Sequence, residues 1–349
     1  MTDAETREQT VLDAVGQRRE LVNEGIAEEL PIKRPERLYE ASRYLLDAGG
    51  KRLRPTVLLA VGEALMDVDP LSTDYREFPS LAGEPVDLMA AAVSVEVIQT
   101  FTLIHDDIMD DDDLRRGVPA VHKEFDLDTA ILAGDTLYSS AFEIMLSSDA
   151  PPAQVVAAMD TLASTCTKIC EGQSLDVAFE ERGDVLPEEY LEMVEQKTAV
   201  LYAASAAIAA QLLSADEETV EALYGYGLDI GRAFQIQDDV LDLTVPSEDL
   251  GKQRGSDLVE NKQTLITVHA REHGVDVDGL VNTVRVEDVT ETEIDDAVTQ
   301  LEASGSIDYA NEAAKELVEQ GKERLEVLPD NDARDLLCDI ADYLIERGY

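Results

Sequence analysis

Apolar residues recur at three- and four-residue spacing along nearly the whole chain of 349 residues, whereas alternating apolar and polar residues are scarce. The first spacing places apolar side chains on one face of a helix, and alternation is what a half-buried strand needs. Helix punctuation agrees, because Gly49-Gly50 stops one apolar run, Pro85 precedes another and Pro151-Pro152 separates two more. The sequence therefore predicts an all-α protein.

The spacing predicts long helices that pack as one large bundle around a central apolar cavity. Ala-rich segments such as 203–210 favour close helix packing. We expect a single domain, 1–349, in which acidic helices over about 290–347 lie at the periphery. The helices are expected at 4–27, 37–48, 55–66, 86–110, 128–148, 152–181, 187–213, 217–244, 258–273, 290–304, 307–327 and 331–347.

Charge excludes some classes of partner. The chain has 75 Asp and Glu against 28 Lys and Arg, a formal net charge of −47. Such a surface repels nucleic acid and anionic membranes. Because 44% of the residues are hydrophobic, the acidity indicates a folded protein adapted to high salt rather than a disordered chain. We predict a halophilic protein that does not bind nucleic acid.

Location and cysteine chemistry follow from simpler patterns. The N-terminal residues lack a basic region and an apolar stretch, so no signal peptide is expected. The apolar segment 86–109 is interrupted by acidic residues, which argues against a membrane span. Cys166, Cys170 and Cys338 show no metal-ligand pattern and are expected to be buried thiols. We predict a cytoplasmic protein.

Two aspartate motifs carry the chemistry: DDIMD at 106–110 and DDVLD at 238–242. In a helix, positions i and i+4 share a face, so each motif projects a pair of carboxylates from one stripe. Oxygen ligands select Mg2+, which completes its coordination with water and substrate phosphate. The alternative is a solvated acidic face, which is common in so acidic a chain but harder to accept for two motifs with apolar flanks.

Cations are scarce, so their grouping is informative. GGKRLRP at 49–55 joins a helix stop to a helix start, and its Lys51 and Arg54 suit a diphosphate. LRRG at 114–117 follows the first aspartate motif, so one chain offers two phosphate sites. The alternative is a basic loop that balances nearby acids.

Taken together, GGKRLRP, LIHDDIMD with LRRG, GQSLD at 172–176, KT at 197–198, and FQIQDDVLD with GKQRGSDL resemble the trans-isoprenyl diphosphate synthases in order and spacing. The match spans about residues 37–265. The resemblance implies an all-α isoprenoid synthase fold, a homodimer and several Mg2+ ions bridged to an allylic diphosphate.

The resemblance also implies roles for individual residues. Isopentenyl diphosphate is expected to be bound by Lys51, Arg54, Gln99 and Arg116. Mg2+ is expected to be held mainly by Asp106, Asp110 and Asp238, with Asp107, Asp239 and Asp242 in support. The allylic diphosphate is expected to be held by Arg115, Lys197, Thr198, Gln235, Lys252 and Lys262. Asp106, Asp110, Asp238 and Lys197 are the expected catalytic residues.

The first motif has two possible registers. The run 110–113 is all Asp, so the third ligand is either Asp110 or, in a longer motif, Asp112. The nine positions from Asp106 to Arg115 are those of the shorter motif, which favours Asp110. Residues 111–113 are then expected to be solvated.

The resemblance also implies the reaction and its product. Ionisation of the allylic diphosphate, attack by the isopentenyl double bond and loss of a proton lengthen the chain by five carbons. Phe101, five residues before Asp106, resembles the aromatic floor of archaeal geranylgeranyl diphosphate synthases, with Thr102 beside it. We therefore expect geranylgeranyl diphosphate made from dimethylallyl, geranyl or farnesyl diphosphate.

Three alternatives stay open. A farnesyl or longer polyprenyl product needs only a different pocket depth. A terpene cyclase shares DDxxD, but its second metal motif normally mixes Asn, Ser or Thr with Glu. A non-catalytic partner subunit is expected to have lost a motif, and here each motif is present.

Overall fold

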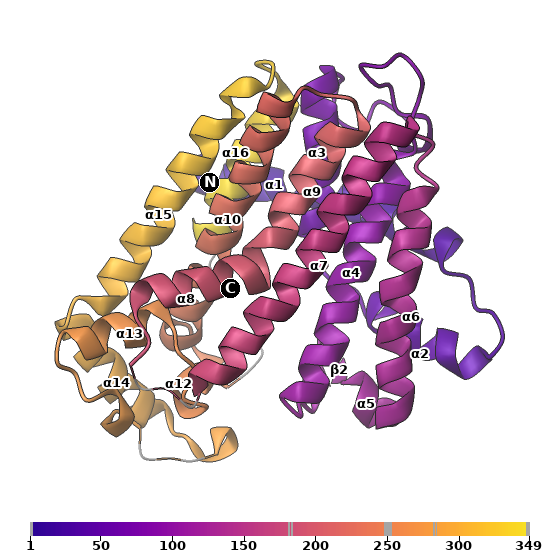
Figure 1. Ribbon diagram of the computed structural model, residues 1–349. Helices are drawn as coiled ribbons and strands as arrows, with labels where there is room; N and C mark the ends of the chain where they lie inside the picture. The colour runs from indigo at the N-terminus through magenta and orange to yellow at the C-terminus, as the bar shows by residue number, and fades with distance from the viewer. Residues whose placement is uncertain are drawn as a thin grey trace. The chain divides into compact units, whose positions relative to one another are not determined.

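Helices make up nearly all of the regular structure in the computed structural model, which describes residues 3–180, 182, 184–247, 253–281, 283 and 285–346 (Figure 1). Within these residues the strands are the two-residue β1 (Leu114–Arg115) and β2 (Val118–Pro119), which pair antiparallel. The all-α prediction is confirmed.

The described chain divides into two compact units. Unit 1 comprises Met1–Ser164, Ala204–Tyr224 and Leu325–Asp339, and unit 2 comprises Thr165–Ala203, Gly225–Arg324 and Ile340–Tyr349. Each is described by itself below, and the single domain over 1–349 stays a prediction.

Unit 1 is built around α4 (Leu88–Met109), which packs against α6 (Leu127–Leu146) along its length and also against α3 (Leu53–Met66) (Figure 1). By length and hydropathy α4 passes the test for a membrane span, but 72% of its apolar window is buried inside the protein, as in a core helix. The remaining elements of unit 1 are α1 (Asp3–Glu29), α2 (Glu36–Asp47), η1 (Tyr75–Glu77), α5 (Val121–Glu124), η5 (Leu325–Val327), the first part of α7 (Pro152–Glu180), most of α9 (Val200–Leu212) and the first parts of α10 (Glu217–Thr244) and α16 (Asp332–Glu346).

In unit 2, Gly227 and Gly231 let α10 approach α9 and η2 (Glu195–Ala199) closely. A Cβ at Gly231 would lie 2.6 Å from Ala199 Cα, so only glycine fits there. The other elements of unit 2 are α8 (Pro187–Val194), η2 (Glu195–Ala199), α12 (Ser256–Val259), α13 (Leu265–Glu272), η3 (Val277–Gly279), η4 (Val286–Asp288), α14 (Glu291–Ala303) and α15 (Ser306–Arg324).

Three local features differ from the predicted helices. The helix expected over 187–213 contains a π-helical turn, η2, between α8 and α9. The helix expected over 258–273 is two helices, α12 and α13, because Thr264 caps α13 at its N-terminus by accepting from Thr267 N. The β1–β2 hairpin and α5 were not expected. Cysteine burial is also mixed, since Cys166 is buried, Cys338 is intermediate and Cys170 is exposed.

Candidate active site

The first aspartate motif ends α4. Asp106 lies in the last turn and Asp110 is the C-cap, whose N–H donates to the Asp106 carbonyl. Between them Asp107 is fully buried and accepts from Arg115 Nε at 2.6 Å. Burial raises the pKa of Asp107 to about 6, against the lowering effect of Arg115. The motif thus uses one aspartate to hold Arg115 and keeps the exposed Asp110 and half-exposed Asp106 at the surface.

The aspartates that follow are ion-paired rather than only solvated. Asp111 and Asp113 are each 85% exposed and lie 2.8 and 3.0 Å from Lys123 Nζ. Asp112 is 2.8 Å from Arg115 Nη2. Arg115, expected to hold the allylic diphosphate, therefore lies between the Asp107 carboxylate on α4 and the Asp112 carboxylate in this loop.

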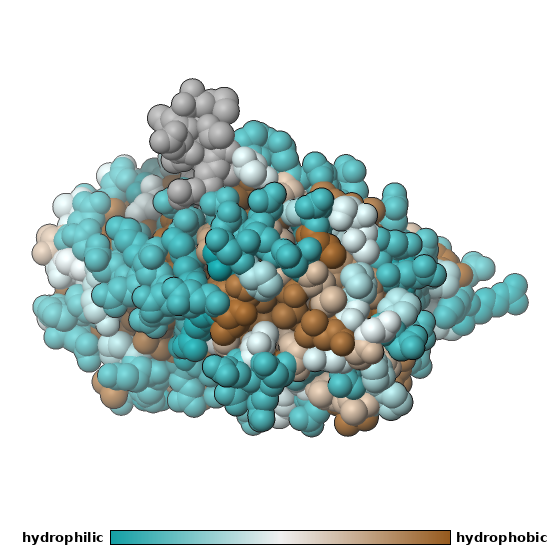
Figure 2. Space-filling model, turned by 90° about the horizontal axis from the view of Figure 1, so that it is seen from above, coloured by the Kyte–Doolittle hydropathy of each residue, from teal (hydrophilic) through white to brown (hydrophobic). Residues whose placement is uncertain are grey.

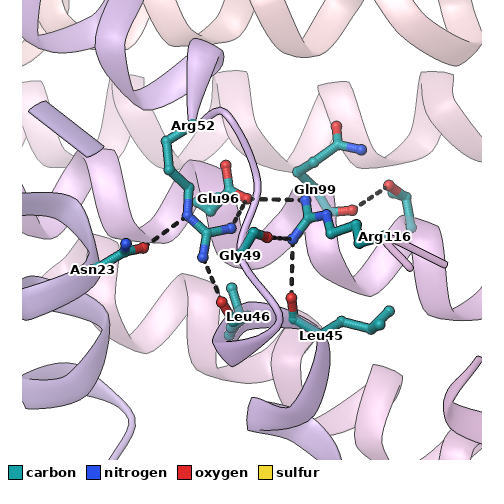
Figure 3. Close-up of polar contacts among 9 residues, drawn as sticks. Asn23, Leu45, Leu46, Gly49, Arg52, Glu96, Gln99 and Arg116 are labelled. Atoms are coloured by element: carbon teal, nitrogen blue, oxygen red, sulfur yellow. Dashed lines mark hydrogen bonds and ion pairs between the residues drawn. The ribbon is translucent and has the colours of Figure 1, made fainter. Parts of the chain in front are cut away.

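The LRRG motif forms a two-residue hairpin turn. Arg116 and Gly117 have φ of 53° and 77°, the two positive values that a type I′ turn requires. The turn directs Arg116 to the other basic motif, where its Nη1 donates to the carbonyls of Leu45, at 3.0 Å, and Gly49 (Figure 3). A Cβ at Gly50 would lie 2.9 Å from Arg116 Cζ, and residues with a side chain rarely adopt its φ of 142°, so glycine suits this position.

The expected isopentenyl diphosphate residues all lie in unit 1. Lys51 is exposed in the loop before α3, and Arg54 is half-buried in the first turn of that helix. Gln99 is half-buried on α4, and its backbone carbonyl accepts a hydrogen bond from the Thr102 hydroxyl at 2.8 Å. The structure thus brings Arg116 to the GGKRLRP loop, although the two motifs are about 60 residues apart in sequence.

In unit 2 the π-helical turn η2 carries Lys197 and Thr198. Such turns insert one residue into a helix and are frequent at functional sites. The Lys197 ammonium donates to Asp176 Oδ2 at 2.5 Å. Gly172 lies against this turn, because a Cβ there would be closer than 3.0 Å to the Lys197 backbone N. The GQSLD motif therefore supports Lys197 through both its first and its last residue.

A chain of hydrogen bonds joins Thr198 to the second aspartate motif. Its hydroxyl donates to Gln235 Oε1 at 3.0 Å, and Gln235 Nε2 donates to Asp239 Oδ1 at 3.0 Å. The Tyr190 hydroxyl donates to Asp239 Oδ2 at 2.5 Å. Burial raises the pKa values of both Asp239 and Tyr190. These residues, together with Lys197 and Lys262, line one pocket of unit 2.

The other aspartates of the second motif differ in environment. Asp242 is fully buried, and its carboxylate accepts from the Ser256 hydroxyl at 2.9 Å and from Asp257 N at 3.2 Å. Asp238 is half-exposed. Asp242 thus ties the segment after α10 to that helix, while Lys252, in the same segment, lies outside the described residues.

Sequence reasoning gave no role to Asp176, Tyr190, Arg52 or Glu96, which hold expected site residues in place. Asp176 could have been found, because it ends the GQSLD motif. Tyr190 had no sequence signal, since only the fold brings α8 to α10.

Around Phe101 the structure has a cluster of rings. Its centroid lies 4.9 Å from that of His105 and 5.2 Å from that of Tyr138 on α6. Phe142 continues the cluster at 5.1 Å from Tyr138. Phe101 is therefore fixed by aromatic neighbours one and a half turns before Asp106.

The donor set of each aspartate motif fits Mg2+. Its side chains offer only carboxylate oxygens, the ligands that Mg2+ prefers. Among the described residues no group of three or more acidic, His or Cys side chains forms a ready cage. Mg2+ does not need one, because it is usually held by one or two carboxylates, water and substrate phosphate. In the first motif Asp106 and Asp110 would hold Mg2+, and in the second motif Asp238 would hold Mg2+.

Comparison with known proteins agrees with this geometry. The polyprenyl synthetase family model matches residues 35–301. The chain is 69% identical to a geranylfarnesyl diphosphate synthase of Natronomonas pharaonis, over 97% of this chain and 98% of that protein. It is 50% identical to a geranylgeranyl diphosphate synthase of Methanosarcina mazei, over 97% and 99% of the two chains. The solved geranylgeranyl pyrophosphate synthetase of Geoglobus acetivorans has a TM-score of 0.84 at 45% identity, covering 95% of this chain and 99% of that one. The chain belongs to the polyprenyl synthetase family, and it is a trans-prenyltransferase with the all-α isoprenoid synthase fold.

Proposed function

We propose that this protein is a Mg2+-dependent prenyltransferase that condenses isopentenyl diphosphate with dimethylallyl, geranyl or farnesyl diphosphate to give geranylgeranyl diphosphate and diphosphate. The main support for the proposal is that Arg116 donates hydrogen bonds to the carbonyls of Leu45 and of Gly49 in the GGKRLRP loop. The two basic motifs therefore lie together in unit 1. A terpene cyclase has no use for a second diphosphate site of this kind.

Each group of residues has one task in this reaction. Lys51, Arg54 and Arg116 bind the isopentenyl diphosphate, and Lys197 with Thr198 binds the allylic diphosphate. When bound, Mg2+ stabilises negative charge on the leaving diphosphate. Lys197 donates to the same leaving group, while apolar side chains keep water from the allylic cation. The isopentenyl double bond is the nucleophile, and the departing diphosphate takes the proton that the new product loses, so neither a side-chain nucleophile nor a side-chain base is needed.

We propose that the length of the product is set by the space available to the growing chain before Asp106. We propose that the ring cluster of Phe101, His105 and Tyr138 stops growth at twenty carbons, with Thr102 beside it. A second candidate is the twenty-five-carbon product, because the relative that is 69% identical is a geranylfarnesyl diphosphate synthase. A farnesyl or a longer polyprenyl product would require only a different pocket depth.

Replacing Phe101 with alanine is expected to lengthen the main product by at least five carbons, because the truncation opens space behind the allylic chain. The measurement is chromatography of the dephosphorylated products made from labelled isopentenyl diphosphate and each primer in high salt with Mg2+. Phe125→Ala is the control, since Phe125 packs on Tyr44 instead. An unchanged product from a folded Phe101→Ala enzyme would exclude Phe101 as the floor, and a twenty-five-carbon wild-type product would select the second candidate.

We also propose a homodimer in a salt-rich cytoplasm. Exposed apolar side chains gather on α6, among them Leu127, Ile131 and Leu132, and isolated monomers rarely leave a large apolar patch uncovered. Hydrophilic residues cover most of the face in Figure 2, around a smaller hydrophobic area. Sedimentation equilibrium in molar salt is expected to give twice the chain mass of 38.2 kDa, and Ile131→Glu is expected to give the monomer. A monomeric wild type would contradict the proposal.

A further inference from the structure

One buried carboxylate on α4 contacts the two basic motifs of unit 1. Glu96, ten residues before Asp106, is only 3% exposed. Its Oε1 accepts from Arg52 Nη1 at 2.6 Å and lies 3.4 Å from Arg116 Nη2. Figure 3 shows the two guanidinium groups approaching Glu96 from opposite sides, one from the GGKRLRP loop and one from the hairpin turn.

Arg52 is committed to the protein interior. It is 2% exposed and has φ of 53° and ψ of 38° at the N-cap of α3, a conformation that is costly for a residue with a side chain. Its three nitrogens donate to Asn23 Oδ1 at 3.0 Å, to Leu46 O at 2.6 Å and to Glu96 (Figure 3). Arg52 is therefore an anchor of the loop that carries Lys51 and Arg54 and is not a diphosphate ligand.

Arg116 differs from Arg52 in its exposure. Its side chain is 19% exposed, and it is held by Glu96 and the Leu45 and Gly49 carbonyls through Nη1 and Nη2. These contacts fix the direction of the guanidinium while part of it faces solvent. A fixed guanidinium loses less entropy when it binds a diphosphate.

The negative charge of Glu96 stabilises the close approach of Arg52 and Arg116. Two guanidinium groups sharing a buried site repel each other and lose hydration, and the Glu96 carboxylate offsets both effects. Removing the charge of one partner in such a buried set leaves the others uncompensated, which is costly. With Glu96 neutral, the loop and the hairpin turn would separate or take up water, and Arg116 would lose its fixed direction.

We propose that Glu96 is a positioning residue for isopentenyl diphosphate binding, which holds Arg116 and, through Arg52, the Lys51–Arg54 loop in the geometry that grips the diphosphate. The inference rests on the proposed function, because it assigns the second diphosphate site to this cluster. It adds two residues, Glu96 and Arg52, that do not touch substrate themselves.

The test is Glu96→Gln, which keeps the shape of the side chain and removes its charge. The KM for isopentenyl diphosphate is expected to rise about thirtyfold or more, the lower end of the effect when a buried charge pair loses one partner. The KM for the allylic diphosphate, and kcat at saturating isopentenyl diphosphate, are expected to change by less than about twofold, because those tasks belong to other residues.

Glu63→Gln is the matched control. Glu63 is 1% exposed on α3 of the same unit, and it accepts from Arg18 and from the Tyr75 hydroxyl. This variant is expected to lower Tm, because it also breaks a buried ion pair, while both KM values stay unchanged. A rise in the KM for isopentenyl diphosphate in both variants would mean that general loosening of unit 1 is responsible, and it would overturn the proposal.

The remaining outcomes are also decisive. An unchanged KM for isopentenyl diphosphate in folded Glu96→Gln would overturn the proposal while leaving the prenyltransferase function intact. If Glu96→Gln does not fold, Glu96→Asp keeps the charge but moves it by one methylene, and an intermediate rise in that KM is expected. An unchanged KM in Glu96→Asp would then overturn it. Failure of the wild-type enzyme to condense isopentenyl diphosphate would instead refute the proposed function.

Discussion

Asp106→Ala is expected to lower kcat/KM by about 1000-fold, because a lost Mg2+ ligand removes several kcal/mol of stabilisation from the leaving diphosphate. Asp106 lies in the last turn of α4 with Asp110 on the same face, and neither is fully buried. The fold should not depend on Asp106, so Tm is expected to change little. Steady-state kinetics over a range of Mg2+ concentrations measures the effect, and higher Mg2+ is expected to recover only part of the rate.

Asp111→Asn is the control for this variant. Asp111 is 85% exposed, only five residues away, and pairs with Lys123 at the surface. Its removal is expected to change kcat/KM by less than about twofold, since exposed ion pairs contribute little. A large loss in Asp111→Asn with a small one in Asp106→Ala would show that the motif register is shifted and that Asp106 is not the first ligand.

Gly172→Ala is expected to lower the free energy of unfolding by about 3 kcal/mol, because a methyl group has no room there. A Cβ would be closer than 3.0 Å to backbone atoms of Lys197 and Gln196, and backbone cannot rotate away. The π-helical turn must shift, so Lys197 and Thr198 move from their positions. A displacement of about 1 Å can cost about 100-fold in rate. Denaturant unfolding in molar salt and kcat/KM for the allylic substrate measure the two effects.

Gly16→Ala separates this effect from the general behaviour of glycine in helices. Gly16 lies within α1, and a Cβ there would meet no other heavy atom within 4 Å. The same substitution is therefore expected to raise stability by up to about 1 kcal/mol, because alanine is the better helix former. If Gly172→Ala is as stable and as active as the wild type, α7 and the π-helical turn do not pack as closely as the structure indicates.

Much of the fold was predictable because a helix that packs on one face requires apolar residues at three- and four-residue spacing within its own sequence. The spacing of apolar residues predicted α4 as 86–110, against the observed Leu88–Met109, and predicted α10 as 217–244, the observed bounds. The π-helical turn η2 was missed, because periodicity does not distinguish a π-helical turn from the α-helix around it, and its packing against Gly172 involves another helix. The β1–β2 hairpin was missed because two strands of two residues are too short for an alternating pattern.

The candidate site was predictable only in part, for a related reason. Motifs name the residues whose side chains are suited to diphosphate and Mg2+, such as Arg116 and Asp106, because that chemistry restricts the residue type. They do not name the residues that orient them. Tyr190 and Glu96 are common residue types in unremarkable sequence, and their importance depends on which helices pack together.

The sequence by itself determined that the chain is all-α, that two aspartate motifs end or follow apolar helical stretches, and which cations accompany them. These properties are local, since they depend on residues within one or two helical turns. Only the tertiary structure decided that Arg116 reaches the loop of Gly49 and Gly50 and that Asp107 and Asp242 are buried. Burial and contacts between distant segments arise from packing, and the same residue can be a surface ligand or a buried anchor depending on what packs against it.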